Sequence, residues 1–516
     1  MRIRWAVVTA IAILSFIGGG WLARVTDPRM PVARGPEREI FDRVLEAIAT
    51  DHVDGLPEPE LYSDATNGII TGLDDPYAEL LQGESYRRYN DQMSGTRLGL
   101  RLRLREHEGA TGISGSTLDA LGTDVGIGPL DEIIAVDGKS TEGWTPADAA
   151  RALGGSAGTY VTLTVRPFGS TTTVRRRVAR TAVHVPAVSP GVMLGDGVGY
   201  VALHASTETA ARELRDALLA LRTRGMRRLV LDLRQNPGGL IPQAVEIAEL
   251  FLDPADTIAV ARARTPAQSR AHVSRTKQPW PAMPIVLLVN RQTASAAEVI
   301  AGALQDHDRA AVVGLPTYGK GVIQTTYPLG EEVAVKFTTA RWYTPSGRSI
   351  QRNSAAVDTT AVFRSSGGRP LPAGRGIVPD IPVRPDPAIG TDRALVDAMG
   401  GDLGLYRATV AALVRDLKRE GTVSRTRLQP TAAMRTALWR RMQRAGVRVD
   451  RTRFEQAAPN VHRDIGYEIT RQVLGEEAEI RDRLSDDRQL QAATALLRRA
   501  PTQAALVRAL GAARTR

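Results

Sequence analysis

The spacing of apolar residues predicts helices at both ends of the chain and strands between them. In REIFDRVLEAIAT, which begins at Arg38, the apolar side chains recur on one helical face. These side chains are Ile40, Val44, Leu45 and Ile48. The chain from about residue 37 to about residue 90 is therefore expected to be helical. Helical spacing returns beyond about residue 391, and EITRQVLGEEAEIRDRL carries one apolar stripe there, formed by Ile469, Val473, Ile480 and Leu484.

Between residues 93 and 183 the spacing has a period of two, which is typical of half-buried strands. LGLRLRLRE alternates apolar and basic residues, and DEIIAVDGKS predicts two strands joined by an Asp-Gly turn. TYVTLTVRPFG and TTTVRRRVART predict two more strands, and TPADAARALGG predicts a short helix that glycine ends. The pattern indicates a compact β-rich module with one clear helix.

The middle of the chain alternates buried strands with amphipathic helices, which is the pattern of a layered α/β domain. Strands are expected at VGYVALHA, RLVLDLR, PIVLLVN, AAVVG and GVIQTTYPL. Helices are expected at TETAARELRDALLALRTRG, which Gly225 should end, and at LIPQAVEIAELFL and AEVIAGALQDH. The predicted fold class is therefore multidomain α/β.

Residues 1–34 predict a membrane anchor followed by a linker. The run from Trp5 to Ala23 carries no charge and has about the length that spans a bilayer, with Trp5 and Trp21 where interfacial anchors belong. A cleaved signal peptide is the alternative, but no good small-x-small cleavage site follows the run. Arginines on both sides blur the positive-inside signal, and a short stub with a large body outside the cytoplasm is the simplest topology.

The composition excludes several kinds of chemical site and indicates the surroundings of the protein. The chain has 516 residues, too many for one core, and no cysteine, which excludes disulfides, thiolate chemistry and cysteine-based zinc sites. The net charge of +11 comes mostly from arginines spread along the chain, while aromatic residues make up only 5%. This favours an anionic surrounding, such as lipid headgroups or envelope polymers, over nucleic-acid binding. The seven histidines are scattered and show no metal-ligand spacing.

The first candidate catalytic residue is Ser295 in RQTASAAEVI. It follows a buried strand at the first turn of a helix, where free backbone N–H groups, including that of Ala296, could hold a developing oxyanion. With Glu298 three residues on, Ser295 also fits a helix capping box, and taken alone this structural explanation is the better one. His204 and His307 give only weak support to a conventional triad.

A nucleophilic serine needs a base, and Lys320 in PTYGKGVIQTTYPL is the candidate. Gly319 and Gly321 flank it and allow other backbone to approach closely. On a strand, Lys320 and Gln324 share a face, so the amide could orient the amine. Lysine is a base only when neutral, and burial beside apolar walls favours that form. Taken alone, a surface lysine between two glycines is the commoner case.

The third element is the turn in DLRQNPGG. Gly238 and Gly239 follow a buried strand and could present backbone N–H groups to a substrate carbonyl, although Asn-Pro-Gly-Gly is also a good turn in its own right. Each of the three elements is ambiguous alone, and their combination and order are much less so.

Together these segments resemble the carboxyl-terminal processing peptidases of family S41. The resemblance rests on LVLDLRQNPGGL, VNRQTASAAEVIAGALQDHDRAAVVGLPTYGKGVIQ, TPSGRSIQ and GRGIVPDIPV, and extends from about residue 37 to about residue 390, including LDDPYAELL. It implies a ClpP/crotonase-like α/β peptidase core with an inserted PDZ-like domain, the β-rich module that contains VDGKSTEGWTPADAARALGG.

The resemblance also implies roles for the candidate residues. Ser295 matches the nucleophile, Lys320 the general base and Gln324 the residue that orients the lysine. The oxyanion hole matches the Ala296 amide together with Gly238 or Gly239.

The implied reaction passes through an acyl-enzyme that water releases, without a metal or cofactor. Asp306 falls where some relatives have an aspartate that supports activity, and a structural use near the end of the nucleophile helix is the favoured alternative.

The PDZ-like module departs from the family pattern at its carboxylate-binding loop, which is expected at Arg97, Leu98, Gly99 and Leu100. Arg97 and Leu98 replace the smaller residues usual there. A captured peptide would add to the module as a strand, with its carboxylate on loop amides. Family usage suggests that the module also gates the active site.

The expected domain order follows from these segments. It is an anchor and linker at 1–34 with a transmembrane span at about 5–23, an N-terminal helical region at 35–92, a PDZ-like domain at 93–183, a peptidase core at 184–390, and a C-terminal all-helical region at 391–516 that matches no named module.

The expected function is a serine endopeptidase that is anchored in the inner membrane of a bacterium and cleaves envelope proteins near their C-termini. Its expected partners are proteins with accessible C-termini, while a homo-oligomer or an adaptor stays open. One rival is an inactive PDZ scaffold, which would have no need to keep Ser295, Lys320 and Gln324. Another is a crotonase-type acyl-CoA enzyme, which explains neither the PDZ-like module nor the Ser–Lys spacing.

Overall fold

The structure is a computed structural model that describes residues 35–100, 103–106, 113–116, 127, 131–144, 146–155, 158–167, 170–352, 357–358, 360–385, 403–444 and 449–513. The chain divides into two units, Met1–Ala78 and Glu79–Arg516. The predicted anchor at about 5–23 and its linker lie outside the described residues. Among the residues that are described, no helix is long and apolar enough to cross a membrane.

The first unit contains two helices, α2 (Pro36–Asp51) and α3 (Glu58–Thr71), each with proline in its first turn, where the missing N–H costs nothing. The helical prediction for this segment is confirmed. The apolar stripe that predicted α2 is not covered, since Ile40 and Val44 are 61% and 49% exposed.

The second unit is built on a six-stranded sheet in the order β10-β11-β12-β15-β16-β21. Its strands are β10 (Val192–Met193), β11 (Val198–Ala202), β12 (Arg228–Asp232), β15 (Ile285–Val289), β16 (Ala311–Gly314) and β21 (Ile381–Pro382). All neighbours are parallel except β10 and β11. A parallel sheet needs cover on both faces, and β11, β12, β15 and β16 are buried almost throughout.

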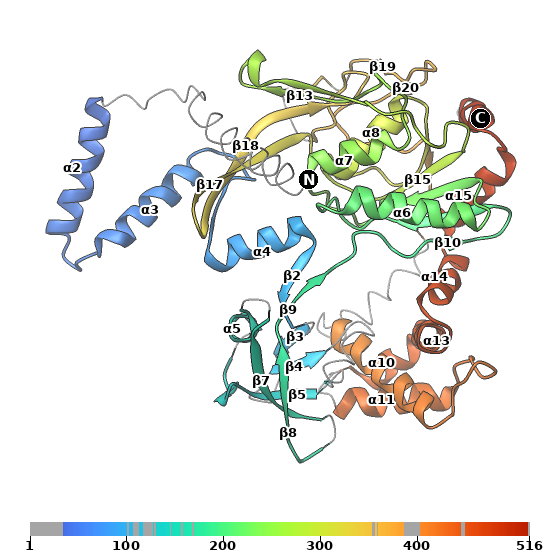
Figure 1. Ribbon diagram of the computed structural model, residues 1–516, viewed down its shortest axis with the longest axis horizontal. Helices are drawn as coiled ribbons and strands as arrows, with labels where there is room; N and C mark the ends of the chain where they lie inside the picture. Colours follow the sequence, from blue (N-terminus) through green and yellow to red (C-terminus); the bar gives the residue numbers. More distant parts are fainter. Residues whose placement is uncertain are drawn as a thin grey trace, which may run out of the picture. The chain divides into compact units, whose positions relative to one another are not determined.

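Three helices cover one face of this sheet: α6 (Ala210–Thr223), α7 (Ile241–Glu249) and α8 (Ala296–Asp306) (Figure 1). Their apolar residues form one core with Leu229, Leu231 and Leu287 of the sheet. The helices and strands predicted for this part of the chain are present, and Gly225 follows the end of α6 with a φ of 90°.

The other face is covered from the far end of the chain. Helices α15 (Arg488–Arg499) and α16 (Gln503–Ala513) pack Leu490, Leu497 and Leu506 against Val230 and Leu288. These helices lie in the region expected to be helical, 391–516, and they pack on the core sheet. The reason is the alternation along each strand, which sends every second apolar side chain to the face that α6, α7 and α8 leave bare.

The preceding helices have a core of their own. They are α10 (Leu403–Arg419), α11 (Ala432–Arg444), α12 (Arg451–Gln456) and α13 (Ala458–Leu474), packed around Leu413, Leu438, Phe454 and Ile465. Helix α14 (Glu476–Ser485) follows them and precedes α15 in the chain.

The β-rich module is a six-stranded antiparallel sheet in the order β3-β4-β5-β7-β8, with β6 beside β5. It contains β3 (Arg103–Glu106), β4 (Ile113–Ser116), β5 (Asp131–Val136), β6 (Lys139–Ser140), β7 (Tyr160–Arg166), β8 (Val174–Ala179) and helix α5 (Pro146–Leu153). Asp137 and Gly138 both have positive φ, 47° and 81°, as the predicted hairpin turn requires. The β-rich pattern is confirmed, while the PDZ identity of the module stays a prediction.

The expected carboxylate-binding loop is not a loop for most of its length. Arg97, Leu98 and Gly99 lie in strand β2 (Thr96–Gly99), which pairs along its whole length with β9 (Thr181–His184). This pairing joins the two segments by which the chain enters and leaves the module, and it overrides the loop prediction. Leu100 follows the strand and packs against the module's core.

A second, antiparallel sheet carries the segment after Lys320. It contains β1 (Glu79–Gln82), β13 (Thr257–Ala263), β14 (Arg270–Val273), β17 (Val322–Gly330) and β18 (Val333–Tyr343), with both β1 and β17 paired to β18. The prediction of helix up to about residue 90 is therefore wrong at β1, because β18 offers a strand edge that the local pattern could not reveal. Helix α4 (Gly83–Ser94) follows β1.

We predict that Leu497→Ala destabilises the sheet core by about 2–5 kcal/mol, because Leu497 is fully buried and its loss leaves a cavity. Urea unfolding of the purified chain measures this effect. Leu219→Ala, at a position 47% exposed on α6, is the matched control and should change the free energy of unfolding by less than about 0.5 kcal/mol. Equal effects of the two substitutions would contradict the assignment of α15 to the core.

Candidate active site

The candidate residues gather where strands β12 and β15 end. The two strands are parallel neighbours, so the loops that follow them leave the same edge of the sheet. Ala294 N–H donates to the Asn236 carbonyl at 2.9 Å, and Thr293 Oγ1 donates to the Leu233 carbonyl at 2.8 Å. These bonds join the glycine turn to the serine turn, at the sheet edge where ligands of open α/β sheets usually bind.

Ser295 lies at the start of α8 in a strained conformation. Its φ is 55° and its ψ is −121°, a region that residues other than glycine rarely adopt. The side chain is only partly buried. Such strain persists only where the surroundings enforce it, and it concentrates at functional sites. The glycine turn supplies that enforcement.

Gly238 packs directly against the serine turn. A Cβ added to Gly238 would lie 2.8 Å from the Ala294 carbonyl oxygen and 2.9 Å from Ser295 Cβ, and the φ of Gly238 is +98°. Its own N–H donates to Asn236 Oδ1 at 2.8 Å. The Gly238 amide is therefore already used, which weakens it as an oxyanion donor.

Gly239 and Ala296 are better placed to donate. The structure records no acceptor for either N–H among the described residues. Gly239 has a φ of +139°, and a Cβ there would lie 2.5 Å from the Ser206 carbonyl oxygen. Ala296 is the first residue of α8, whose amide no helical carbonyl can reach. Of the two predicted glycines, the geometry favours Gly239.

A buried glutamate holds the serine turn and the lysine loop together. Glu298 is 0% exposed, and its Oε2 accepts the N–H groups of Ser295 and Lys320, each at 2.9 Å. The two backbone nitrogens therefore lie within twice that distance of each other. Oε1 accepts the Gly319 N–H at 2.7 Å and the Thr317 hydroxyl at 2.5 Å.

The sequence pattern assigned Glu298 only to the capping box. Its bond to the Ser295 N–H belongs to that box, whereas the bonds to the lysine loop have no local signal in the sequence. Burial raises the pKa of the Glu298 carboxyl above its ordinary value, and its four hydrogen-bond donors oppose that rise.

Lys320 lies in the loop before β17 and is partly buried. The flanking glycines act as predicted: a Cβ at Gly319 would lie 2.9 Å from Arg352 Cβ, and one at Gly321 would lie 2.9 Å from the Gln351 nitrogen. The Lys320 carbonyl accepts the indole N–H of a buried tryptophan, Trp342, at 3.0 Å. The backbone of Lys320 is thus fixed on both sides.

Gln324 lies in β17 and donates its amide N–H to Thr338 Oγ1 of β18 at 3.1 Å. Lys320 precedes the strand, and the pairing of β17 with β18 shifts register between Ile323 and Gln324. A shift of register interrupts the alternation of faces, so the argument from a period of two does not hold between Lys320 and Gln324. The orienting role of Gln324 stays a prediction.

Asp306 and His307 lie at the opposite end of α8 from Ser295. Asp306 Oδ1 pairs with Arg348 Nη2 at 2.7 Å, and both side chains are almost fully buried. His307 Nε2 lies 2.7 Å from the Thr257 carbonyl oxygen. The helix, about 16 Å long at 1.5 Å per residue, separates both from the serine. The buried pair of Asp306 therefore favours the structural use of this residue, and His307 lies too far from the serine to complete a triad.

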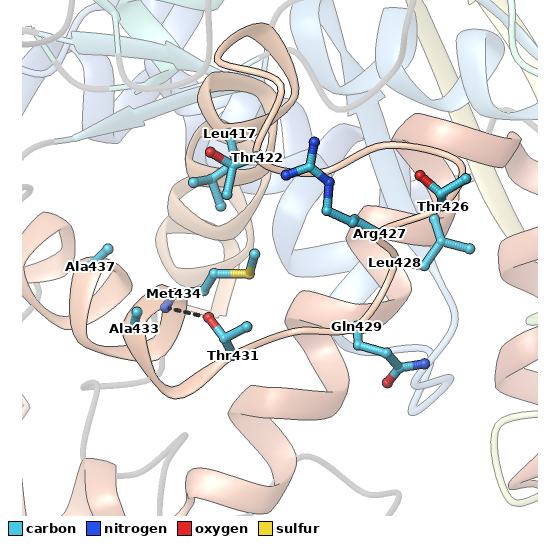
Figure 2. Close-up of a pocket in the computed structure, with 10 residues that line it drawn as sticks. All are labelled: Leu417, Thr422, Thr426, Arg427, Leu428, Gln429, Thr431, Ala433, Met434 and Ala437. Carbon is cyan, nitrogen blue, oxygen red and sulfur yellow. Dashed lines mark hydrogen bonds between the residues drawn. The ribbon is translucent and has the colours of Figure 1, made fainter.

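One cavity, away from Ser295 and Lys320, has no carboxylate, histidine or lysine in its lining. It lies between α10 and α11 with a volume of about 540 Å³ (Figure 2). Its lining is mostly apolar, with Arg427 as the only charged side chain: Leu417, Thr422, Thr426, Arg427, Leu428, Gln429, Thr431, Ala433, Met434 and Ala437. This cavity therefore offers no pair of nucleophile and base like the one at the sheet edge. Among all the residues that the structure describes, no group of three or more His, Asp or Glu could hold a metal ion.

Comparisons with known proteins show which proteins this chain is similar to. The sequence model of peptidase family S41 matches residues 197–383. The chain is 33% identical over 315 residues to a carboxy-terminal-processing protease of Bartonella bacilliformis, covering 60% of this chain and 72% of that protein. It is 30% identical over 326 residues to a probable CtpA-like serine protease of Staphylococcus haemolyticus, covering 63% of this chain and 65% of that protein. The match thus spans just under two thirds of the staphylococcal protein.

Solved structures are less similar. A photosystem II D1 C-terminal processing protease is 24% identical, with a TM-score of 0.39, over 72% of this chain and 99% of that one. A putative S41 protease from Bacteroides fragilis is 16% identical, with a TM-score of 0.37, over 62% of this chain and 82% of that one.

We predict that Gly238→Ala lowers peptide hydrolysis by about a hundredfold or more, because the added Cβ would push the serine turn out of place. The measurement is the hydrolysis rate on an unfolded test protein. Gly225→Ala is the control, since Gly225 has a φ of +90° but nothing within 4 Å of its Cβ position. It should cost about 1 kcal/mol of stability and no activity. Equal activity of both variants would rule out the proposed contact between the turns.

We also predict that Glu298→Gln lowers hydrolysis at least about tenfold and destabilises the fold by about 2 kcal/mol or more. A glutamine amide has only one acceptor oxygen, so in either orientation two donors face its NH₂ group. Hydrolysis rates and urea unfolding test this. Glu246→Gln, at an exposed position on α7, should change neither.

Proposed function

This chain belongs to peptidase family S41 and is a serine-type peptidase, and we propose that Ser295 and Lys320 form its catalytic dyad. The observation that carries the proposal is the buried Glu298 carboxylate, whose Oε2 accepts the backbone N–H groups of both residues at 2.9 Å. Two segments 25 positions apart in the sequence are thereby fixed to one atom. Backbones held in this way support the proposal, because a nucleophile and its base must lie close together.

The proposed reaction begins when the neutral Lys320 amine takes the proton of Ser295 Oγ as the oxygen attacks the scissile carbonyl carbon. The N–H groups of Ala296 and Gly239 donate to the oxyanion that forms. Lys320 then gives the proton to the leaving amine, and the C–N bond breaks to leave an acyl-enzyme. Water then attacks the ester carbon while it loses a proton to Lys320. The C–O bond to Ser295 breaks as Lys320 returns that proton to Ser295 Oγ, which releases the C-terminal carboxyl group of the product and restores the free serine and the neutral lysine. In this scheme Gln324 orients the lysine amine.

We propose that the substrates are proteins with accessible C-termini, as the names of the similar proteases suggest for those proteins. The β-rich module would act as a PDZ domain that recognises the C-terminus. Because Arg97, Leu98 and Gly99 are paired in β2, the carboxylate would be held at the ends of this strand, with Leu100 nearby.

Gating of the active site by the module is supported by a series of contacts. Where the chain enters the module, the Met93 carbonyl accepts the Glu208 N–H at 3.0 Å, and Gly95 packs closely on Thr207. The next residue back, Ser206, forms a parallel bridge with Gly239. Movement of the module could therefore reach the oxyanion glycine through three adjacent residues.

We propose a bacterial cell-envelope location, with residues 5–23 as an inner-membrane anchor. The uncharged run and its flanking tryptophans support this, and the excess of arginine suits an anionic surface. An inactive scaffold is the second candidate function. It would give no reason for the strained φ of Ser295 or for the glycine that is fitted against it.

We predict that Ser295→Ala and Lys320→Ala each reduce hydrolysis by about a thousandfold or more while peptide binding is kept. In the unsubstituted chain, kcat/KM should rise with pH, because only the neutral lysine accepts a proton. Mass spectrometry of an unfolded protein, made with an apolar or a charged C-terminus, gives both the cleavage sites and the C-terminal preference.

Lys336→Ala is the matched control, since Lys336 lies in β18 of the same sheet and pairs with Glu79. Its activity should equal that of the unsubstituted chain. Normal cleavage by Lys320→Ala would contradict the proposed dyad, and cleavage by Ser295→Ala would contradict the assignment of Ser295 as the nucleophile.

A further inference from the structure

The C-terminal helices reach the loop that carries the oxyanion glycines. Arg234, in that loop, pairs with Asp232 at the end of β12, with Nη2 2.6 Å from Oδ2. The same Nη2 lies 2.6 Å from Oδ2 of Asp487, the residue that precedes α15. Arg234 Nη1 donates to Gln489 Oε1 at 2.9 Å. One guanidinium thus connects the catalytic loop to a helix more than 250 residues further along the chain.

The two oxygens of Asp487 have different partners. Oδ1 accepts the N–H groups of Gln489 and Leu490 at 2.9 and 3.1 Å, which caps the first turn of α15. Oδ2 faces Arg234. Capping needs only an acceptor oxygen, which asparagine also has, whereas the pairing with Arg234 needs the negative charge. The two contributions can therefore be separated by one substitution.

This cluster is largely shielded from water. Arg234 is 17% exposed, Asp232 6% and Asp487 18%. Burial alone would lower the pKa of the Arg234 guanidinium, but the two carboxylates more than offset this and raise it, so the residue stays charged. Charge pairs in such surroundings are screened far less than surface pairs, and removing one partner is felt by the other.

Arg234 lies close to the groups that would hold the oxyanion. Two residues on, Asn236 accepts the Ala294 N–H of the serine turn through its backbone carbonyl and the Gly238 N–H through its side chain. Gly239 follows Gly238, and its N–H has no acceptor among the residues that the structure describes. A shift of Arg234 would therefore be passed through a short, hydrogen-bonded loop to the Gly239 amide and the serine turn.

The docking of α15 has other contacts besides this ion pair. Leu490 and Leu497 of α15 are buried against the sheet, and Gln489 donates to the Val383 carbonyl at 2.7 Å. These contacts hold α15 on the sheet independently of the charge on Asp487, and the contact of that charge with the Arg234 loop needs an explanation of its own.

We propose that Asp487 is a positioning residue of the peptidase, which fixes Arg234 and through it the loop that presents the Gly239 amide to the oxyanion. The last helices of the chain are then part of the catalytic machinery. This inference rests on the proposed function, because it assumes that the Gly239 amide serves the reaction of Ser295.

The test is Asp487→Asn in the purified full-length protein, with kcat, KM and the unfolding temperature measured together. Asparagine keeps an acceptor oxygen for the cap of α15 and removes the negative charge that faces Arg234. We expect kcat to fall about tenfold with KM changed less than about twofold, because the oxyanion contact forms only in the transition state. The unfolding temperature should fall only slightly, because Arg234 keeps its pair with Asp232, and Asp487→Glu should recover most of the lost kcat.

Asp196→Asn is the matched control, since Asp196 pairs with Arg498 of the same helix at 2.8 Å, with the two side chains 62% and 54% exposed. An exposed pair of this kind contributes little, so kcat, KM and the unfolding temperature should all match those of the unsubstituted protein. If both aspartate variants lose the same activity, Asp487 acts only through general support of α15, and the proposal is overturned.

A double-mutant cycle tests whether Asp487 acts through Arg234. In an Arg234→Gln background, Asp487→Asn should lower kcat no further, because its partner is already gone. Additive losses would overturn the proposed route, as would an unchanged kcat in Asp487→Asn alone. Ser295→Ala keeps the two proposals apart: hydrolysis by that variant refutes the proposed function, whereas its loss together with a normal Asp487→Asn refutes only the positioning role.

Discussion

The candidate active site depends on one buried carboxylate. Glu298 accepts four hydrogen bonds, two of them from the backbones of Ser295 and Lys320. A fully buried acid without these donors would be costly, and four donors without the acid would be left unsatisfied. The serine turn and the lysine loop therefore form as one unit. The proposed nucleophile and the proposed base are therefore positioned by a residue that takes no part in the proposed bond-breaking steps.

The six-stranded sheet, which is covered on both faces, places the serine turn and the glycine turn at one of its edges. Strands β12 and β15 run side by side and in parallel, so the glycine turn and the serine turn emerge next to each other. Such strands need apolar cover on both faces, and α15 and α16 complete the cover from the far end of the chain. The same packing brings Asp487 to Arg234. The packing of the C-terminal helices therefore also determines which residue faces Arg234 in the loop that carries Gly238 and Gly239.

Much of this could be predicted because it is local. Buried strands such as RLVLDLR and PIVLLVN, the helices that follow them and the Asp-Gly hairpin turn are encoded in neighbouring residues. What could not be predicted involves partners distant in the sequence. Strand β1 forms because β18 offers an edge, and β2 forms because β9 pairs with it. Neither partner can be identified from the period of the residues alone.

The sequence by itself determined which residues could carry the chemistry, since a serine at a helix start, a lysine between glycines and a Gly-Gly turn are short-range features. Only the tertiary structure decided how they are used. It engaged the Gly238 amide with Asn236, sent Asp306 to a buried pair with Arg348, and broke the alternation between Lys320 and Gln324. It also gave Glu298 and Asp487 their partners. The physical reason is that a hydrogen bond or a charge pair between segments depends on distances in space, and spacing along the chain fixes those distances only within one element.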